Sequence, residues 1–295
     1  MNGLTAVALI LLTLSEIAAF LPTHFQYQIT FAKQFGYILL MLLIFTIFYA
    51  STVLKFRVFL LVGIAFAAGA LSELLGTTYG WVYGQRYYYT ASFLGYKVFG
   101  RIPFSILLLW TIIIMLAYSI TNIIDPANFF SLKKTLNIRS FAYVLLLSTL
   151  DGFLAMNLDL ILDPIYVGFG AWVWPEGGAY FGVPISNFLG WFFVAFTATL
   201  IFRIYSLNRP YKIEVDLYYL APVIAYAIMG IVKYGIVSNV AGHVEYAIIG
   251  ISVMFPFIAI ATLSYRLKKS KADLSSVTRG VASCSRPCDT EEVDG

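Results

Sequence analysis

Long apolar runs dominate this chain and restrict what it can fold into. Eight such runs follow one another, and each is close to the ~20 residues that a helix needs to cross a bilayer. The chain of 295 residues is 60% hydrophobic and 12% charged, whereas soluble domains carry about 25% charged residues. We therefore predict an all-α, polytopic integral membrane helical bundle of about eight transmembrane helices, at residues 4–21, 36–54, 57–76, 103–122, 140–162, 185–204, 218–238 and 245–265.

The distribution of basic residues predicts the orientation of these helices, because cytoplasmic loops of membrane proteins are enriched in lysine and arginine. With both termini in the cytoplasm, the opposite side receives only Lys33, Arg86, Lys97 and Arg101. The cytoplasmic side receives Lys55, Arg57, Lys133, Lys134, Arg139, Arg203, Arg209, Lys212, Arg266, Lys268, Lys269 and Lys271. We therefore predict a multi-pass protein of the cell membrane with cytoplasmic N- and C-termini.

Two long loops fall on the non-cytoplasmic side, at residues 77–102 and 163–184, and both are rich in aromatic residues and glycine. Aromatic residues concentrate at membrane interfaces, so an interfacial belt is one interpretation. The loops are longer than a belt requires, which favours segments that fold back over a cavity. After residue 271 the sequence turns polar, and we predict a transmembrane domain over 1–271 and a disordered tail over 272–295.

Several acidic residues lie inside or at the edge of the predicted spans. An ionisable side chain in a membrane costs a few kcal/mol, so such residues are functional candidates. Asp151, Asp159 and Asp163 fall within an arc of about 120° on one helix face. That face lines a cavity or packs against partners rather than facing lipid. The complete set is Glu16, Glu73, Asp151, Asp159, Asp163 and Glu245.

The main candidates also have structural interpretations. Glu73 and Asp159 could belong to an ion pair or hydrogen-bond network that fixes helix packing, and Lys233 is a candidate partner for one of the acids. Asp163 precedes a proline, so it could end a helix at the water interface. Asn187 could hold a water molecule or cap the sixth predicted helix.

Acids in an apolar, aromatic, water-poor pocket favour one type of chemistry. A buried carboxyl group can keep its proton and act as an acid, and aromatic faces stabilise a nearby cation. Together they suit protonation of an alkene to a carbocation, followed by capture of water, cyclisation or loss of a proton. This chemistry needs no cofactor, and its substrate would be a lipid-soluble polyene or isoprenoid.

Sequence motifs for other chemistries are missing. There is no Gly-rich nucleotide loop, no GxSxG and no HExxH, and His24 and His243 lack metal-ligand spacing. The cysteines, Cys284 and Cys288, both lie in the polar tail, which excludes a structural disulfide framework. We predict no cofactor, no metal and no nucleic-acid partner.

Four blocks of the chain, together with the layout of eight spans, resemble the membrane carotenoid hydratase family, the bisanhydrobacterioruberin hydratase and gamma-carotene hydratase-like carotenoid biosynthesis proteins. The blocks are SELLGTTYGWVYGQRYYYT, GRIPFSILLLW, LDGFLAMNLDLILDPI and WVWPEGGAYFGVPISNFLGW. The resemblance implies a hydro-lyase that adds water to the terminal C=C bond of an acyclic carotenoid, giving a tertiary alcohol. Other membrane enzymes of the carotenoid pathway are potential partners.

On this hypothesis, Glu73, Asp159 and Asp163 are the catalytic residues. Asp159 or Glu73 donates the proton, Asp163 and Asn187 hold the water, and aromatic rings stabilise the cation. The predicted substrate-binding residues are Tyr79, Trp81, Tyr83, Asp151, Trp172, Trp174, Asn187 and Lys233.

Three other functions fit part of the pattern. A carotenoid cyclase of the lycopene type also starts from an acid-generated cation, which an alkene captures instead of water. A proton-coupled transporter keeps acids in membrane pockets, but we find no internal repeat of the kind that transporters show. A retinal-binding protein would use Lys233, but the eighth predicted span and the large aromatic loops argue against it.

Overall fold

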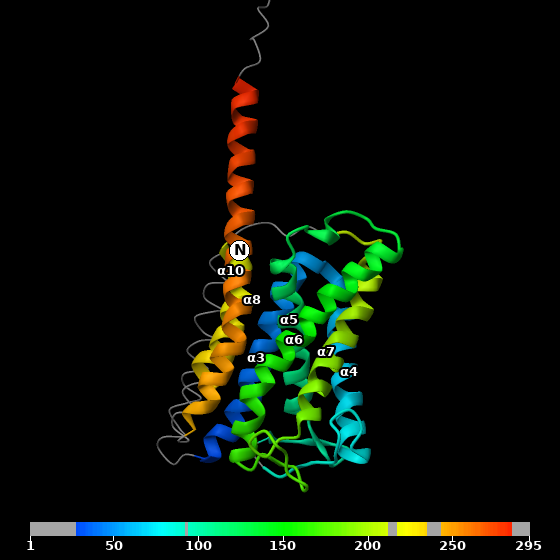
Figure 1. Cartoon of the computed structure of the whole chain (residues 1–295), viewed down its shortest axis with the longest axis vertical. Coiled ribbons are helices and arrows are strands. Elements are labelled where there is room, and N and C mark those ends of the chain that lie inside the picture. Colours follow the sequence, from blue (N-terminus) through cyan, green and yellow to red (C-terminus); the bar gives the residue numbers. More distant parts are fainter. Residues whose placement is uncertain (1–27, 92–93, 212–216, 235–242, 285–295) are drawn as a thin grey trace, which may run out of the picture.

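The structure is a computed structural model that describes residues 28–91, 94–211, 217–234 and 243–284, and these form a bundle of long helices (Figure 1). The long helices are α3 (Gln28–Leu54), α4 (Val58–Tyr79), α5 (Phe104–Ile124), α6 (Ile138–Gly168), α7 (Ile185–Ser206) and α10 (Val244–Cys284). Shorter helical pieces are the 3-10 turns η1 (Lys55–Arg57), η3 (Phe129–Ser131) and η4 (Leu217–Leu220), the helix α8 (Ala221–Ala227) and the π-helical turn η5 (Ile228–Tyr234).

Five segments of the described chain are long and apolar enough to cross a membrane. The first, Leu42–Tyr79, holds the C-terminal part of α3 and all of α4, and the turn η1 divides it where Lys55 has a φ of +54°. The predicted all-α membrane class is confirmed. The predicted span 4–21 lies outside the described residues, and only part of the predicted span 218–238 is described, so the count of eight stays a prediction.

Helix α5 is the centre of the bundle. It is buried continuously from Ser105 to Ile123, and it packs against α3, α4, α6, α7, α8 and α10. A helix that is apolar all round belongs in an interior rather than on a surface. The surrounding helices therefore separate α5 from lipid, and its side chains are available to internal sites.

Helix α6 continues past Asp163, where one interpretation of the sequence ends the helix. Pro164 lies inside the helix, which runs on to Gly168, so Asp163 does not end α6 at a water interface. Asp163 is instead buried, with 3% of its surface exposed. Helix α6 begins with a capping box in which the Asn137 side chain accepts from the backbone of Ser140, whose hydroxyl accepts from the Asn137 N–H.

The two aromatic loops lie together at one end of the bundle (Figure 1). Strand β1 (Tyr88–Tyr89), from the loop between α4 and α5, pairs antiparallel with β4 (Trp172–Val173), from the loop between α6 and α7. A second short ladder joins β2 (Lys97–Val98) to β3 (Ile102–Pro103) just before α5. The pairing of β1 with β4 brings the aromatic side chains of both loops over the ends of the helices.

The C-terminal helix α10 is long and extends well beyond the rest of the bundle (Figure 1). The predicted domain boundary at residue 271 falls inside this helix, which continues to Cys284. Residues 285–295 lie outside the described residues.

Candidate active site

Glu73 lies near the end of α4 and is buried, with 3% of its surface exposed. Its carboxylate accepts hydrogen bonds from three neutral donors. The hydroxyls of Tyr87 and Tyr89 donate to Oε2 at 2.5 and 2.7 Å, and the indole N–H of Trp110 donates to Oε1 at 2.8 Å. Donors occupy both carboxylate oxygens, so the Glu73 side chain acts as a hydrogen-bond acceptor in this environment.

The two tyrosines keep their protons at neutral pH. Burial and the neighbouring Glu73 carboxylate raise the pKa of Tyr87 and of Tyr89 well above the ordinary tyrosine value of about 10. Each hydroxyl therefore remains a donor to Glu73. Tyr87 and Tyr89 reach the same carboxylate because side chains two residues apart in an extended segment point to the same face.

Tyr83 fixes the first aromatic loop to two helices. Its ring lies where glycines leave space, since a Cβ on Gly76 of α4 would come within 2.4 Å of the ring and one on Gly190 of α7 within 2.6 Å. Its hydroxyl donates to Ser72 Oγ at 2.8 Å, and its carbonyl accepts from Ser186 Oγ at 2.8 Å. The glycines thus allow a tyrosine to fill the gap between α4 and α7.

A second acidic group faces Glu73 from α6. The Asn187 side chain of α7 donates to Asp159 Oδ2 at 2.7 Å and to Asp163 Oδ2 at 2.6 Å. Asp159 is fully buried and Asp163 is 3% exposed. One amide therefore connects two carboxyl groups that lie one helical turn apart.

Two buried polar atoms near this group lack a hydrogen-bond partner within the described residues. They are Oδ1 of Asp159 and the indole nitrogen of Trp174. Buried polar atoms are nearly always satisfied, so each exception calls for an explanation. Of these two residues only Trp174 lines the cavity described next, and its indole nitrogen is available there to a small polar molecule.

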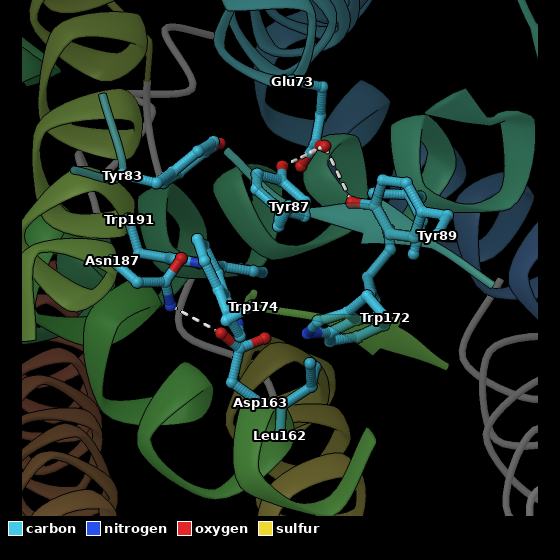
Figure 2. A pocket seen from close by; sticks show the side chains of 12 residues that line it. Glu73, Tyr83, Tyr87, Tyr89, Leu162, Asp163, Trp172, Trp174, Asn187 and Trp191 are labelled. Carbon is cyan, nitrogen blue, oxygen red and sulfur yellow. Dashed lines mark hydrogen bonds between the residues drawn. The ribbon is translucent and has the colours of Figure 1, made fainter. Parts of the chain in front are cut away.

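A small cavity separates the two acidic groups. Figure 2 shows Glu73 with Tyr87 and Tyr89 on one side of it, and Asp163 with Asn187 on the other. Its volume is about 20 Å³, and a cavity of roughly 10–15 Å³ is enough for one water molecule. The remaining lining residues are Tyr83, Ile106, Leu109, Leu162, Trp172, Trp174 and Trp191.

Aromatic rings form a continuous packed wall around this cavity. Trp174 packs against Tyr87 with ring centroids 4.5 Å apart, and Trp172 meets Tyr89 edge to face at 5.7 Å. On the bundle side, Trp110 and Trp191 stack at 4.0 Å. The cavity thus combines carboxyl groups with electron-rich ring faces and little space for bulk water.

A family model described as "carotenoid biosynthesis protein" matches residues 34–257. The chain belongs to this family. All residues that line the cavity fall within the matched segment, and the resemblance seen in the sequence blocks is confirmed.

One relative of this carotenoid biosynthesis protein is the bisanhydrobacterioruberin hydratase of Haloarcula japonica, which is 32% identical over 130 residues. The match covers 44% of the chain and 39% of the relative, so well under half of the relative's length is spanned. No solved structure matches the chain.

The structure of this family member brings most of the predicted site residues together. Glu73, Tyr83, Asp163, Trp172, Trp174 and Asn187 all line the cavity, and Asp159 adjoins it through Asn187. Tyr79 and Trp81 do not line it. Their rings pack together 5.1 Å apart and are 59% and 63% exposed.

Asp151 lies in a separate polar cluster. It forms a fully buried ion pair with Arg203 at 2.9 Å, and the same guanidinium donates to Asn122 Oδ1 at 2.9 Å. Arg203, counted from the sequence among the basic residues of the cytoplasmic side, is buried, and its side chain turns into the bundle toward this acid. Lys233 is the candidate partner that the sequence offers for one of the acids. Its backbone belongs to η5, but its side chain is not among those that the structure describes.

Of the two remaining predicted acids, the structure describes only Glu245, which does not line the cavity. Glu16 lies outside the described residues, and Glu245 is about half exposed beside His243.

The site residues predicted from the sequence do not include four residues that complete the two clusters, namely Tyr87, Tyr89, Trp110 and Arg203. The alternation of Tyr87 and Tyr89 is a strand-like signal that could have paired them on one face. Trp110 lies in an unbroken apolar run of α5, where nothing in the local sequence distinguishes it. Arg203 is one charge near the end of an apolar run, and only its partner Asp151 shows which way it points.

Proposed function

We propose that this protein adds water to the terminal C=C bond of an acyclic carotenoid and produces a tertiary alcohol, which makes it a hydro-lyase. The observation that carries the proposal is the cavity of about 20 Å³ with acidic groups on opposite sides. Membership of the carotenoid biosynthesis protein family and the similarity to a hydratase support the substrate class.

The Asp159–Asp163 pair is the proton donor in this proposal. Two buried carboxyl groups that share one amide donor repel each other when both are ionised, so the pair keeps a proton between them. Asp163 lines the cavity, whereas Asp159 does not. Asp163 therefore delivers the proton to the less substituted carbon of the terminal alkene, and Asp159 stabilises the charge left behind by redistributing the remaining hydrogen bonds.

The aromatic wall stabilises the tertiary carbocation. The rings of Tyr87, Trp172 and Trp174 line the cavity directly, and a cation near an aromatic face gains roughly 0.5–2 kcal/mol per ring. A tertiary cation also explains the position of the product hydroxyl, because water adds to the more substituted carbon. The apolar walls keep out further water that would compete for the proton.

Glu73 is the general base. Its three donors stabilise the carboxylate form, and it lies across the cavity from Asp163. The water held between them adds its oxygen to the cation and gives a proton to Glu73. That proton returns to the aspartate pair through the next water molecule, so each turnover consumes one alkene and one water and restores both carboxyl groups.

The polyene end needs more space than the cavity provides. A volume of about 20 Å³ accepts water but not a branched alkene. The walls that must separate come from the two loops, which contribute Tyr87, Tyr89, Trp172 and Trp174. Substrate binding therefore involves movement of the paired strands β1 and β4 relative to the helix ends.

We also propose that the aromatic loops lie on the non-cytoplasmic side of the membrane, with both termini in the cytoplasm. The turn η1 and the loop between α5 and α6 lie at the end of the bundle opposite the aromatic loops (Figure 1). These segments carry Lys55, Arg57, Lys133 and Lys134, as the enrichment of basic residues in cytoplasmic loops requires.

Expression in a host that accumulates lycopene or its elongated derivatives tests the proposal. Mass analysis of the pigments should show products heavier by one water per modified end. A product of unchanged mass with new rings would identify a cyclase instead, and unchanged pigment would reject both activities. A Glu73→Gln variant of equal abundance serves as the inactive control.

A further inference from the structure

A second and larger cavity adjoins the candidate active site. It has a volume of about 460 Å³ and is lined by residues from the last turn of α4 and from the loop before α5. This volume is within the usual range of small-molecule sites, roughly 300–1,000 Å³. Its lining residues are Thr77, Thr78, Arg86, Tyr87, Tyr88, Tyr89, Lys97, Gly100 and Arg101.

The charge of this cavity is entirely positive. Arg86, Lys97 and Arg101 line it, and no acidic residue does. Within the described part of the chain none of these three side chains pairs with a carboxylate. Lys97 donates to the Tyr89 carbonyl at 2.5 Å and Arg101 to the Thr78 hydroxyl at 3.2 Å, so both heads are held in place at the cavity.

The cavity lies between the ends of two candidate membrane spans, which is where a lipid headgroup would lie. Its walls come from the end of one candidate span at Tyr79 and the residues just before the next, which begins at Phe104. The residues that precede Lys97 and Gly100 in the sequence are large and aromatic, with Tyr96 79% exposed and Phe99 77% exposed. Basic groups beside exposed aromatic residues are suited to the interface, where rings contact acyl chains and cations contact phosphate.

We propose that this cavity binds the phosphate group of an anionic phospholipid headgroup through Arg86, Lys97 and Arg101. Guanidinium groups bind phosphate oxygens by paired, charge-assisted hydrogen bonds, and the hydroxyls of Thr78 and Tyr88 supply further donors. The lipid would lie against the outer face of Tyr87 and Tyr89, which line both cavities. The binding site itself is independent of the proposed reaction.

Amide hydrogen exchange of the full chain in lipid nanodiscs tests this site directly. Discs of phosphatidylcholine alone are compared with discs containing increasing fractions of phosphatidylglycerol. We expect slower exchange in the β2–β3 segment (residues 97–103) with phosphatidylglycerol. The Arg86→Gln/Arg101→Gln variant should require about fivefold more anionic lipid per lost arginine for the same protection.

Three controls make the result decisive. A Lys133→Gln/Arg139→Gln variant removes two exposed charges from the opposite end of the bundle and should keep the protection. An Arg86→Lys/Arg101→Lys variant retains the charge and should keep most of it, and unchanged exchange in α5 reports an intact fold. Equal exchange in both lipids would overturn the proposal. So would equal protection by millimolar inorganic phosphate in phosphatidylcholine discs, because the ligand would then be a free anion.

Discussion

The hydroxyl of Tyr87 donates a 2.5 Å hydrogen bond to the carboxylate of Glu73, and this bond joins an aromatic loop to the interior of a candidate membrane span. A second donor from the same loop, Tyr89, occupies the same carboxylate oxygen. The loop therefore sets the hydrogen bonding of the acid as well as covering it. In the proposed reaction, this contact defines Glu73 as the group that accepts a proton from water.

Replacing Tyr87 with phenylalanine keeps the ring and removes the donor. Because a hydrogen bond to a charged group contributes roughly 1.5–3 kcal/mol, we expect Tyr87→Phe to lower hydration about tenfold or more. The matched control is Tyr88→Phe, since Tyr88 is 54% exposed and lies outside the smaller cavity. The measurement is hydrated carotenoid per amount of folded protein. Equal losses in the two variants would argue against a specific role for the Tyr87 hydroxyl.

Removing either acidic group on its own should slow the reaction strongly. General acid or base catalysis contributes roughly 10²–10⁴-fold, so Glu73→Gln and Asp163→Asn should each lower hydration by about 100-fold or more. Glu245→Gln is the control, because that side chain is 47% exposed and lies at the start of α10. Product analysis in a lycopene-accumulating host measures the effect. Hydrated product at wild-type levels from either cavity variant would reject the assigned roles.

The buried pair of Asp151 and Arg203 should matter for stability rather than for chemistry. Removing one partner leaves an uncompensated buried charge, which costs roughly 3–5 kcal/mol. We expect Asp151→Asn to lower the melting temperature sharply, and the double variant Asp151→Leu/Arg203→Met to recover much of the loss. Both should hydrate normally per folded molecule, because neither residue lines the cavity. A double variant that folds but does not hydrate the carotenoid would indicate that Asp151 belongs to the substrate site.

Two glycines of similar helical context separate close packing from helix propensity. At Gly190 a Cβ would lie 2.6 Å from the Tyr83 ring and 2.7 Å from the Val82 carbonyl, whereas at Gly63 it would meet nothing within 4 Å. Overpacking costs roughly 1–3 kcal/mol, so Gly190→Ala should destabilise the protein and displace Tyr83. Gly63→Ala should be neutral or stabilising, because alanine favours helix more than glycine does. Thermal unfolding of both variants in one detergent makes the comparison, and equal melting temperatures would contradict the close packing.

The apolar runs were sufficient to predict a helical membrane bundle, because no soluble fold buries that much apolar surface in helices of this length. The acids were predictable for the same physical reason. A carboxyl group inside a span is costly, so Glu73, Asp159 and Asp163 stood out, and helical periodicity alone placed the two aspartates on one face. Their separation by one turn is a local property of α6.

The partners of these acids depend on contacts between distant segments, which local sequence does not encode. Tyr87 and Tyr89 reach Glu73 because β1 pairs with β4, whereas Tyr79 at the end of α4 and Trp81 in the loop remain exposed. In the sequence, Trp110 is one residue of an apolar run and Arg203 is a single charge near the end of another. Their contacts with Glu73 and Asp151 exist only because separate helices pack together. The sequence by itself determined the class of fold and which acids are costly to bury. Only the tertiary structure decided which donors stabilise each acid, because hydrogen bonds at 2.5–2.9 Å require side chains from separate helices and loops to meet.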